Sequence, residues 1–146
     1  SNRNSTVPQK EQATSSETGR KARGYQGNVL AGSLAPFLEF NQADYDKAKA
    51  EGKIIILDFY ANWCPICRAE EPEIFAGFEE LNNPDVVGFR VNFNDSDTGA
   101  DEKALAQQFN IPYQHTKVVL KNGIEVSRSS DSWKKEALVS AVKSAL

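Results

Sequence analysis

The chain has 146 residues, of which 40% are hydrophobic and 25% are charged, and this balance predicts one soluble globular domain rather than two. No apolar stretch reaches the roughly 20 residues that are needed to cross a bilayer. The formal net charge is −3, and its positive part is concentrated near the N-terminus. The acidic remainder argues against nucleic acid as a partner.

The first 35 residues are rich in Ser, Thr, Gln, Gly and charge, and they contain little that a fold could bury. They predict a disordered polar linker over 1–35, followed by a domain over 36–146. A basic cluster at 20–23 is either solvated linker charge or a contact for an anionic membrane surface. The chain contains no methionine, so we expect a processed protein from which a signal or a membrane anchor has been removed.

Strand and helix patterns alternate from residue 36 onward. Residues 36–40 and 53–61 are apolar runs typical of strands, and the second is expected to be buried on both faces of a sheet. Between them, residues 41–52 have the alanines and the terminal glycine of a helix. Residues 66–83 predict another helix, in which Pro72 should introduce a kink.

The second half continues the alternation. It predicts a strand over 86–94, a helix over 99–110, two hairpin strands around an Asn-Gly turn within 116–130, and an amphipathic helix over 131–146. The predicted order of elements is βαβαβαββα, which is an α/β fold.

Both cysteines of the chain lie in "NWCPIC" at 62–67, directly after the buried strand. Residues three apart on a helix share a face, so Cys64 and Cys67 can form and break a disulfide with little backbone movement. Cys64 is expected at the helix N-terminus, where free N–H groups stabilise a thiolate and make it the attacking nucleophile. Pro65 is tolerated in the first turn. Cys67, one turn deeper, is expected to be the shielded resolving thiol.

Two other interpretations of the cysteine pair are weaker. A structural disulfide would enclose only two residues and would therefore constrain the unfolded chain little. A closed zinc site usually has four ligands, whereas two cysteines and one histidine supply three unless a carboxylate completes the set. We therefore expect no cofactor other than a redox-active disulfide.

The segment "ILDFYANWCPICR" resembles the thioredoxin-family signature, Asp-Phe-aromatic-Ala-x-Trp-Cys-x-x-Cys-Lys/Arg, and a proline five residues after the second cysteine matches as well. "VVLKNGIEV" resembles the last hairpin of that family, so the resemblance covers about 37–146. A CxxC pair between a buried strand and a helix is itself typical of a thioredoxin-like redox site. The resemblance implies a thioredoxin fold, with a central mixed sheet flanked by helices, and thiol-disulfide exchange with protein disulfides.

Among relatives, "IILDFYANWC" and "VNFNDSDTGADEKALAQQFNI" are similar to the C-terminal periplasmic domain of the thiol reductase DsbD. This similarity implies a reductase of the cell envelope, outside the cytoplasm and tethered to the membrane through a missing N-terminus. A membrane thiol donor would then supply its electrons, and we expect a monomer. A single CxxC pair also suits a cytosolic reductant, which is the alternative localisation.

Asp58 places a carboxyl group in the middle of the buried strand, six residues before Cys64. Desolvation should raise its pKa, and the resemblance implies that it exchanges a proton with Cys67 as part of the catalytic set. The alternative is a structural Asp satisfied by backbone groups or by Arg90. Around the cysteines, Trp63, Pro65 and Ile66 are expected to contact substrate or to tune the site.

The chain departs from the family at one important position. Thioredoxin-like proteins carry a cis-proline before the strand that leads to the final hairpin, and here an alignment without gaps places His115 there, followed by Thr116. The other alignment places Pro112 at the site with an insertion after it. Because a cis bond before a residue other than proline costs about 3–4 kcal/mol, the peptide before His115 is expected to be trans. Its imidazole would stabilise the Cys64 thiolate or act as a base.

Two other classes of function remain open at this point. Copper-delivery proteins of the Sco type share the fold and bind metal through two cysteines and a histidine, which here would be Cys64, Cys67 and His115. Their cysteine spacing is longer than the CxxC of this chain. Alternatively, the domain recognises extended peptides along a strand edge at Thr116, and the CxxC is incidental. His115 is then an ordinary loop residue.

Overall fold

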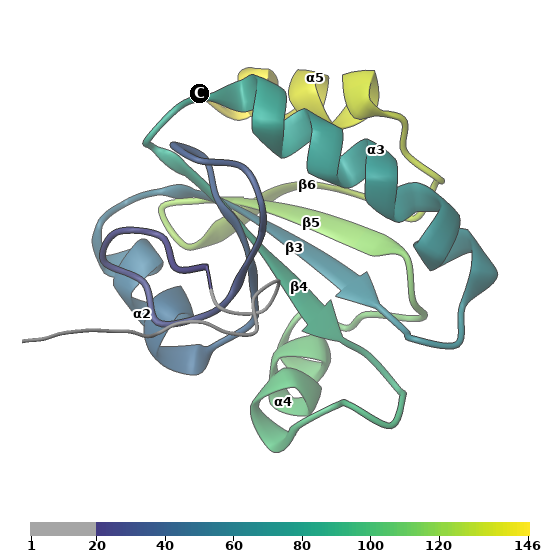
Figure 1. Cartoon of the computed structure of the whole chain (residues 1–146). Helices are drawn as coiled ribbons and strands as arrows, with labels where there is room; N and C mark the ends of the chain where they lie inside the picture. Colours follow the sequence, from purple (N-terminus) through teal and green to yellow (C-terminus); the bar gives the residue numbers. More distant parts are fainter. Residues whose placement is uncertain (1–19) are drawn as a thin grey trace, which may run out of the picture.

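The computed structural model describes residues 20–146. Six strands form one mixed sheet in the order β1-β2-β4-β3-β5-β6. The strands are β1 (Val29–Ala31), β2 (Phe37–Glu39), β3 (Ile54–Tyr60), β4 (Val86–Asn92), β5 (Thr116–Lys121) and β6 (Ile124–Ser129). The helices are α2 (Gln42–Ala50), α3 (Pro65–Leu81), α4 (Ala100–Gln108) and α5 (Lys135–Ala145). The predicted mixed sheet flanked by helices is confirmed (Figure 1).

Strand β3 is the centre of the sheet, and all seven of its residues are buried. It pairs in parallel with β4 and antiparallel with β5, so its backbone groups have partners on both sides. Because successive side chains of a strand point to opposite faces, the apolar run of β3 supplies both cores at once. Ile55, Leu57 and Phe59 belong to one core, whereas Ile54 and Ile56 belong to the other.

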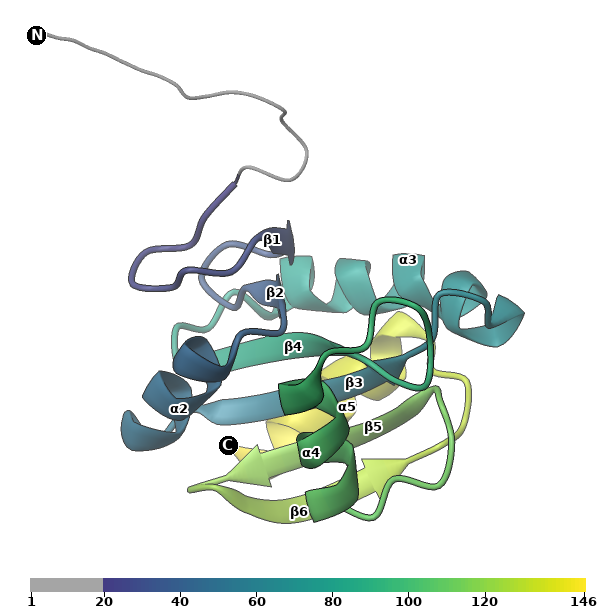
Figure 2. The same ribbon diagram turned by 90° about the horizontal axis from the view of Figure 1, so that it is seen from below.

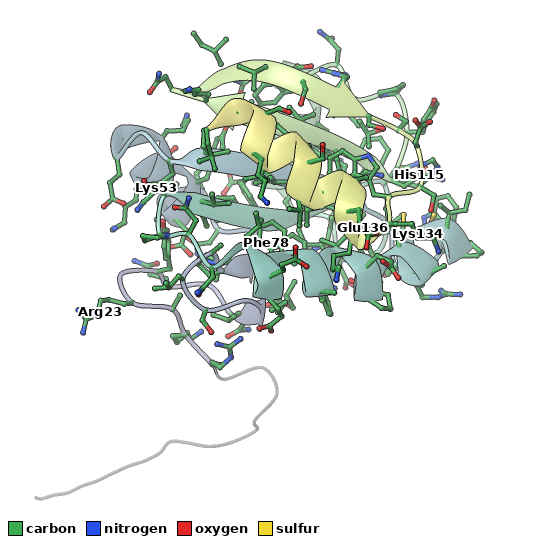
Figure 3. The ribbon with its side chains drawn as sticks, turned by 90° about the horizontal axis from the view of Figure 1, so that it is seen from above. Arg23, Lys53, Phe78, His115, Lys134 and Glu136 are labelled. Carbon is green, nitrogen blue, oxygen red and sulfur yellow. The ribbon has the colours of Figure 1, made fainter. Side chains whose placement is uncertain are left out.

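The two faces of the sheet are covered by different helices (Figures 1 and 2). Helices α3 and α5 lie side by side over one face (Figure 3), and α2 and α4 lie on the opposite face. Tyr45 of α2 and Leu105 of α4 belong to the same core as Leu57, while Phe78 of α3 and Leu138 of α5 belong to the other core. Cys64 caps α3 and Cys67 lies in its first turn, and both pack with Tyr60 and Ala61 in a small cluster of their own.

The prediction of a disordered linker over 1–35 is wrong for its second half. Residues 20–35 pack onto the domain: β1 pairs antiparallel with β2, and the side chains of Val29 and Ala31 are buried. The N–H of Gly32 donates to the Glu79 carboxylate of α3 at 3.0 Å, and Figure 2 shows β1 beside this helix. Two buried apolar side chains are enough to anchor this short edge strand. The polar average composition of 1–35 does not reveal them. The remainder of the predicted linker, 1–19, lies outside the described residues.

Two helix boundaries have clear local causes. Helix α3 begins after Cys64, whose extended backbone makes it the N-cap, and Pro65 occupies the first position, where the missing N–H is tolerated. The helix continues past Pro72 to Leu81. Helix α5 begins at Lys135 rather than at 131. At this start, the N–H of Lys135 donates to the Glu73 carboxylate of α3 at 2.8 Å, and the N–H of Trp133 donates to the buried Glu70 carboxylate. Within residues 20–146, no helix has the length and apolar character needed to cross a membrane.

Candidate redox site

The two cysteines lie at the start of α3, directly behind the end of β3. The sulfur of Cys64 accepts a hydrogen bond from the N–H of Cys67 at 3.2 Å, so one of the free N–H groups of the first helical turn points at this sulfur. Backbone N–H donors and the positive end of the helix dipole stabilise a negative charge at that position. Cys64 therefore occupies the helix N-terminus, and its sulfur is bonded there by a backbone N–H.

Cys67 has the surroundings of the resolving thiol. Burial raises the pKa of Cys67 to about 12, and its hydrogen bond with Cys64 acts in the same direction. Both cysteines are only 2% exposed and both are free thiols here. Shielding by itself therefore does not distinguish them. The difference between them comes from their hydrogen bonds and from their positions relative to the helix end.

Asp58 lies on the face of β3 that α3 covers and is 3% exposed. Burial raises the pKa of Asp58 to about 7, with the negative charge of Glu70 adding to the effect and the positive charge of Lys117 opposing it. The expectation of a raised pKa thus agrees with the structure. A carboxyl group that is half ionised near neutral pH can both accept and return a proton.

Asp58 occupies the middle of a row of charged residues on three neighbouring strands. In the register of the sheet, Arg90 of β4 and Lys117 of β5 lie directly on either side of it. Each cation, however, is paired with a glutamate of α3: Arg90 with Glu71, and Lys117 with Glu70. Within residues 20–146, the Asp58 carboxyl group takes part in no ion pair. The alternative of an Asp neutralised by Arg90 is therefore not what the structure contains.

A polar loop after β4 supports the segment that precedes the cysteines. The N–H of Asn62 donates to the Asp95 carboxylate at 2.7 Å, and the indole N–H of Trp63 donates to the carbonyl of Asn94 at 3.0 Å. The side chain of Arg68 reaches back to the carbonyl of Asn62 at 3.0 Å. These bonds connect the active-site loop to the loop after β4 and to α3, which holds the loop in place.

The surface over the cysteines is apolar. Trp63, Ile66 and Tyr113 are about half exposed, although large apolar side chains are usually buried. The predicted contact residues Trp63 and Ile66 thus face outward, and Pro65 is also exposed. Tyr113 lies in the loop before β5, and the centroid of its ring is 5.6 Å from that of the His115 ring.

His115 directly precedes β5, the strand that leads to the final hairpin. This is the position of the family's cis-proline, so the alignment without gaps is favoured over the one through Pro112. Its N–H donates to the carbonyl of Phe59 at 2.7 Å, and its φ of 53° lies in the left-handed region. The described residues contain no cis peptide bond, so the bond before His115 is trans as predicted. The imidazole Nδ1, however, lies 2.9 Å from the carbonyl of Ser130. The ring is anchored to the segment after β6 and is hydrogen-bonded to neither cysteine, while Figure 3 shows His115 at the end of the molecule where α3 begins.

Thr116 is not available to a ligand. Its side chain is fully buried, and its hydroxyl group donates to the carbonyl of Tyr113 at 2.9 Å and lies 2.8 Å from the Ser130 hydroxyl. Strand β5 is paired on both sides, by β3 and by β6. A peptide therefore cannot add to the sheet along a free edge at Thr116, and the binding-module hypothesis loses its proposed surface.

The metal-binding hypothesis also meets a geometric obstacle. Among residues 20–146, no group of three or more His, Cys, Asp or Glu side chains is arranged to hold a metal ion. The structure thus does not bring Cys64, Cys67 and His115 together as the ligand set that this hypothesis requires.

The buried Glu70–Lys117 pair was not predicted. Its signals in the sequence are a lysine inside the otherwise apolar run "TKVVL" and a glutamate one turn after Cys67, on the same face of the helix. Lys117 and Val119 alternate with Val118, so the lysine has to point toward α3. Only the pairing of the strands shows that these two charges meet beside Asp58.

Comparison with known proteins agrees with this site. The thioredoxin family model matches residues 36–144. An H-type thioredoxin from Fagopyrum esculentum is 33% identical over 100 residues, which cover 68% of this chain and 78% of that protein. The DsbD protein of Pseudomonas fluorescens is 26% identical over 104 residues, but these cover only 17% of it.

Solved structures show the same relationship. A thioredoxin-like protein from Edwardsiella tarda superposes with a TM-score of 0.59 at 32% identity, covering 70% of this chain and 94% of that one. Spinach chloroplast thioredoxin F gives a TM-score of 0.60 at 27% identity, covering 75% and 92%. Together with the buried strand, the N-capping Cys64 and the helix that carries Cys67, these matches identify the chain as a member of the thioredoxin family and a thiol-disulfide oxidoreductase.

Proposed function

We propose that this protein reduces disulfide bonds of other proteins, with Cys64 as the attacking thiolate, Cys67 as the resolving thiol and Asp58 as the group that accepts the proton of Cys67. The observation that carries this proposal is the different bonding of the two sulfurs. The sulfur of Cys64 accepts a hydrogen bond from a backbone N–H at the helix terminus, whereas Cys67 lies one turn into the helix, where burial and its hydrogen bond with Cys64 raise its pKa to about 12.

The chemistry has two steps. The Cys64 thiolate attacks one sulfur of the substrate disulfide, which forms a mixed disulfide and releases the first substrate thiolate. Cys67 then gives its proton to Asp58, and its sulfur attacks the Cys64 sulfur, which releases the second substrate thiolate and leaves a Cys64–Cys67 disulfide. Two electrons pass from the dithiol to the substrate. The released thiolates take up protons from Asp58 and from water.

Two serine variants test the roles of the cysteines. Cys64→Ser should abolish reduction of insulin disulfides, because no attacking thiolate remains. Cys67→Ser should still attack but should accumulate a mixed disulfide, which non-reducing gel electrophoresis and mass spectrometry detect. If Cys67→Ser loses attack while Cys64→Ser traps substrate, the assigned roles are reversed.

The direction of electron flow is tested by the reduction potential of the Cys64/Cys67 pair in a thiol redox buffer. A value near −270 mV, roughly that of thioredoxin, supports a reductase. A value near about −120 mV is that of a strong oxidant and would refute the reductase assignment.

We further propose that the protein works in the cell envelope as a monomer that receives electrons from a membrane thiol donor. The support for this finer statement is the partial similarity to DsbD. Fractionation of cells that produce the full-length protein, combined with labelling by a membrane-impermeant thiol reagent, tests the location. Protection of the thiols from that reagent in intact cells would favour the cytoplasm, and light scattering of the purified chain tests the monomer.

A further inference from the structure

The two most deeply buried charges behind the cysteines are not used in the exchange chemistry described above. Lys117 is fully buried and Glu70 is 2% exposed, and they form an ion pair between β5 and α3. A buried ion pair often contributes little to stability, because the loss of hydration offsets the attraction between the charges. The Glu70–Lys117 pair lies beside Asp58, where its charges act on the proton of that carboxyl group.

The three donors of Lys117 and one carboxylate oxygen of Glu70 are engaged with partners other than Asp58. The Lys117 ammonium group has three donors, and it donates to the Glu70 carboxylate, to the carbonyl of His115 at 2.8 Å and to that of Asp131 at 2.5 Å. The Glu70 carboxylate also accepts the N–H of Trp133 at 2.6 Å. The ammonium group therefore has no donor left to pair with Asp58.

The charges around Asp58 come from every element packed against it. Strand β5 contributes Lys117, strand β4 contributes Arg90, and helix α3 contributes Glu70, Glu71 and the thiol of Cys67. Lys117 is balanced by Glu70 and Arg90 by Glu71, and Arg90 also lies 3.7 Å from the more exposed carboxylate of Glu39. Among the described residues, no cation is thus left over to balance an ionised Asp58. Loss of the Asp58 proton leaves one uncompensated negative charge in a buried place, which is unfavourable.

We propose that Glu70 and Lys117 are positioning residues that set how tightly Asp58 holds its proton, and that Glu70 favours the protonated form of Asp58 by withholding the Lys117 cation from it. The consequence for catalysis rests on the proposed role of Asp58 in proton transfer. The inference about proton binding itself does not depend on that role.

The test is the Glu70→Gln variant, which keeps the size of the side chain and an oxygen for Lys117 and Trp133 while removing the negative charge. The pKa of Asp58 in the reduced protein is followed by ¹³C NMR of its carboxyl group, with Asp58→Asn used to assign the signal. We expect the pKa of Asp58 to fall by about one unit or more, which is a tenfold change in proton binding. An unchanged or higher pKa would overturn the inference.

Two further variants separate the charge effect from a structural one. Glu71→Gln is the matched control, because Glu71 is the next residue of the same helix but pairs with Arg90 at a site where both side chains are 19% exposed; it should lower the pKa of Asp58 by less. In Glu70→Gln/Lys117→Met the pKa should lie between that of Glu70→Gln and that of the wild type, since the unpaired cation is also gone. A merely structural role would not produce this order.

The pH profile of insulin reduction distinguishes this inference from the proposed function. If the NMR titration moves and the pH midpoint of the resolving step moves with it, both are supported. If the NMR titration moves and the midpoint does not, the pair sets proton binding by Asp58, but Asp58 is not the proton acceptor in exchange. If the NMR titration does not move, the role of the pair is refuted while the exchange chemistry stands.

Discussion

Replacement of Asp58 by Asn should make the reduced protein more stable, and increasingly so as the pH rises. Asp58 is buried in the central strand without an ion-pair partner among the described residues, and its pKa rises from 3.8 to about 7 on folding. Each pKa unit corresponds to about 1.4 kcal/mol, so keeping this carboxyl group in the folded protein costs about 4 kcal/mol at a pH where it is ionised. Asn has nearly the same size and no charge, and it removes this cost.

The sign follows from proton binding in the two states. Below about pH 4, Asp58 is protonated both in the folded and in the unfolded chain, and the cost is absent. Between about pH 4 and pH 7 the unfolded chain releases the proton while the folded chain keeps it, so the stability of the wild type falls with rising pH. Above pH 7 the full cost remains. The stability advantage of Asp58→Asn should therefore grow by about 4 kcal/mol between pH 4 and pH 8.5.

The assay is urea unfolding of both proteins in a phosphine reductant at several pH values, because the raised pKa belongs to the dithiol state. Any constant effect of the new amide group is the same at all pH values and cancels in the comparison. Asp85→Asn, which removes an exposed carboxylate just before β4, is the control for a general loss of charge. A difference between Asp58→Asn and the wild type that stays constant from pH 4 to pH 8.5 would refute this account of Asp58.

Two further substitutions test packing and backbone conformation, and urea unfolding measures both. Gly88→Ala should lower the free energy of unfolding by about 1–3 kcal/mol, because its new Cβ would lie 2.8 Å from Cδ1 of Phe37 and also meet the ring of Phe78; an unchanged stability would mean that the rings move aside easily. At His115, with its φ of 53°, the Gly variant should be about 1 kcal/mol more stable than the Ala variant, since both lose the ring and only Ala is strained in the left-handed region. Equal stabilities would contradict that assignment of strain.

The sequence by itself was sufficient for the order of elements from β2 onward and for the cysteine chemistry, because both depend on local patterns. The run "IIILDFY" is apolar on both faces of a strand, so it is buried only as a central strand of the sheet. A CxxC pair after such a strand begins a helix and places one sulfur at the helix N-terminus. Asp58 was conspicuous for the same reason, since a charge within an apolar run requires an explanation.

Only the tertiary structure decided which charges meet. Arg90, Asp58 and Lys117 are neighbours because three strands pair in one register, and Glu70 and Glu71 reach the two cations because α3 crosses that face of the sheet. The same holds for β1, whose few apolar residues become a strand only where β2 offers a free edge. Local patterns fix the faces of each element, whereas the long-range pairing of strands and helices fixes the electrostatic surroundings of the redox site.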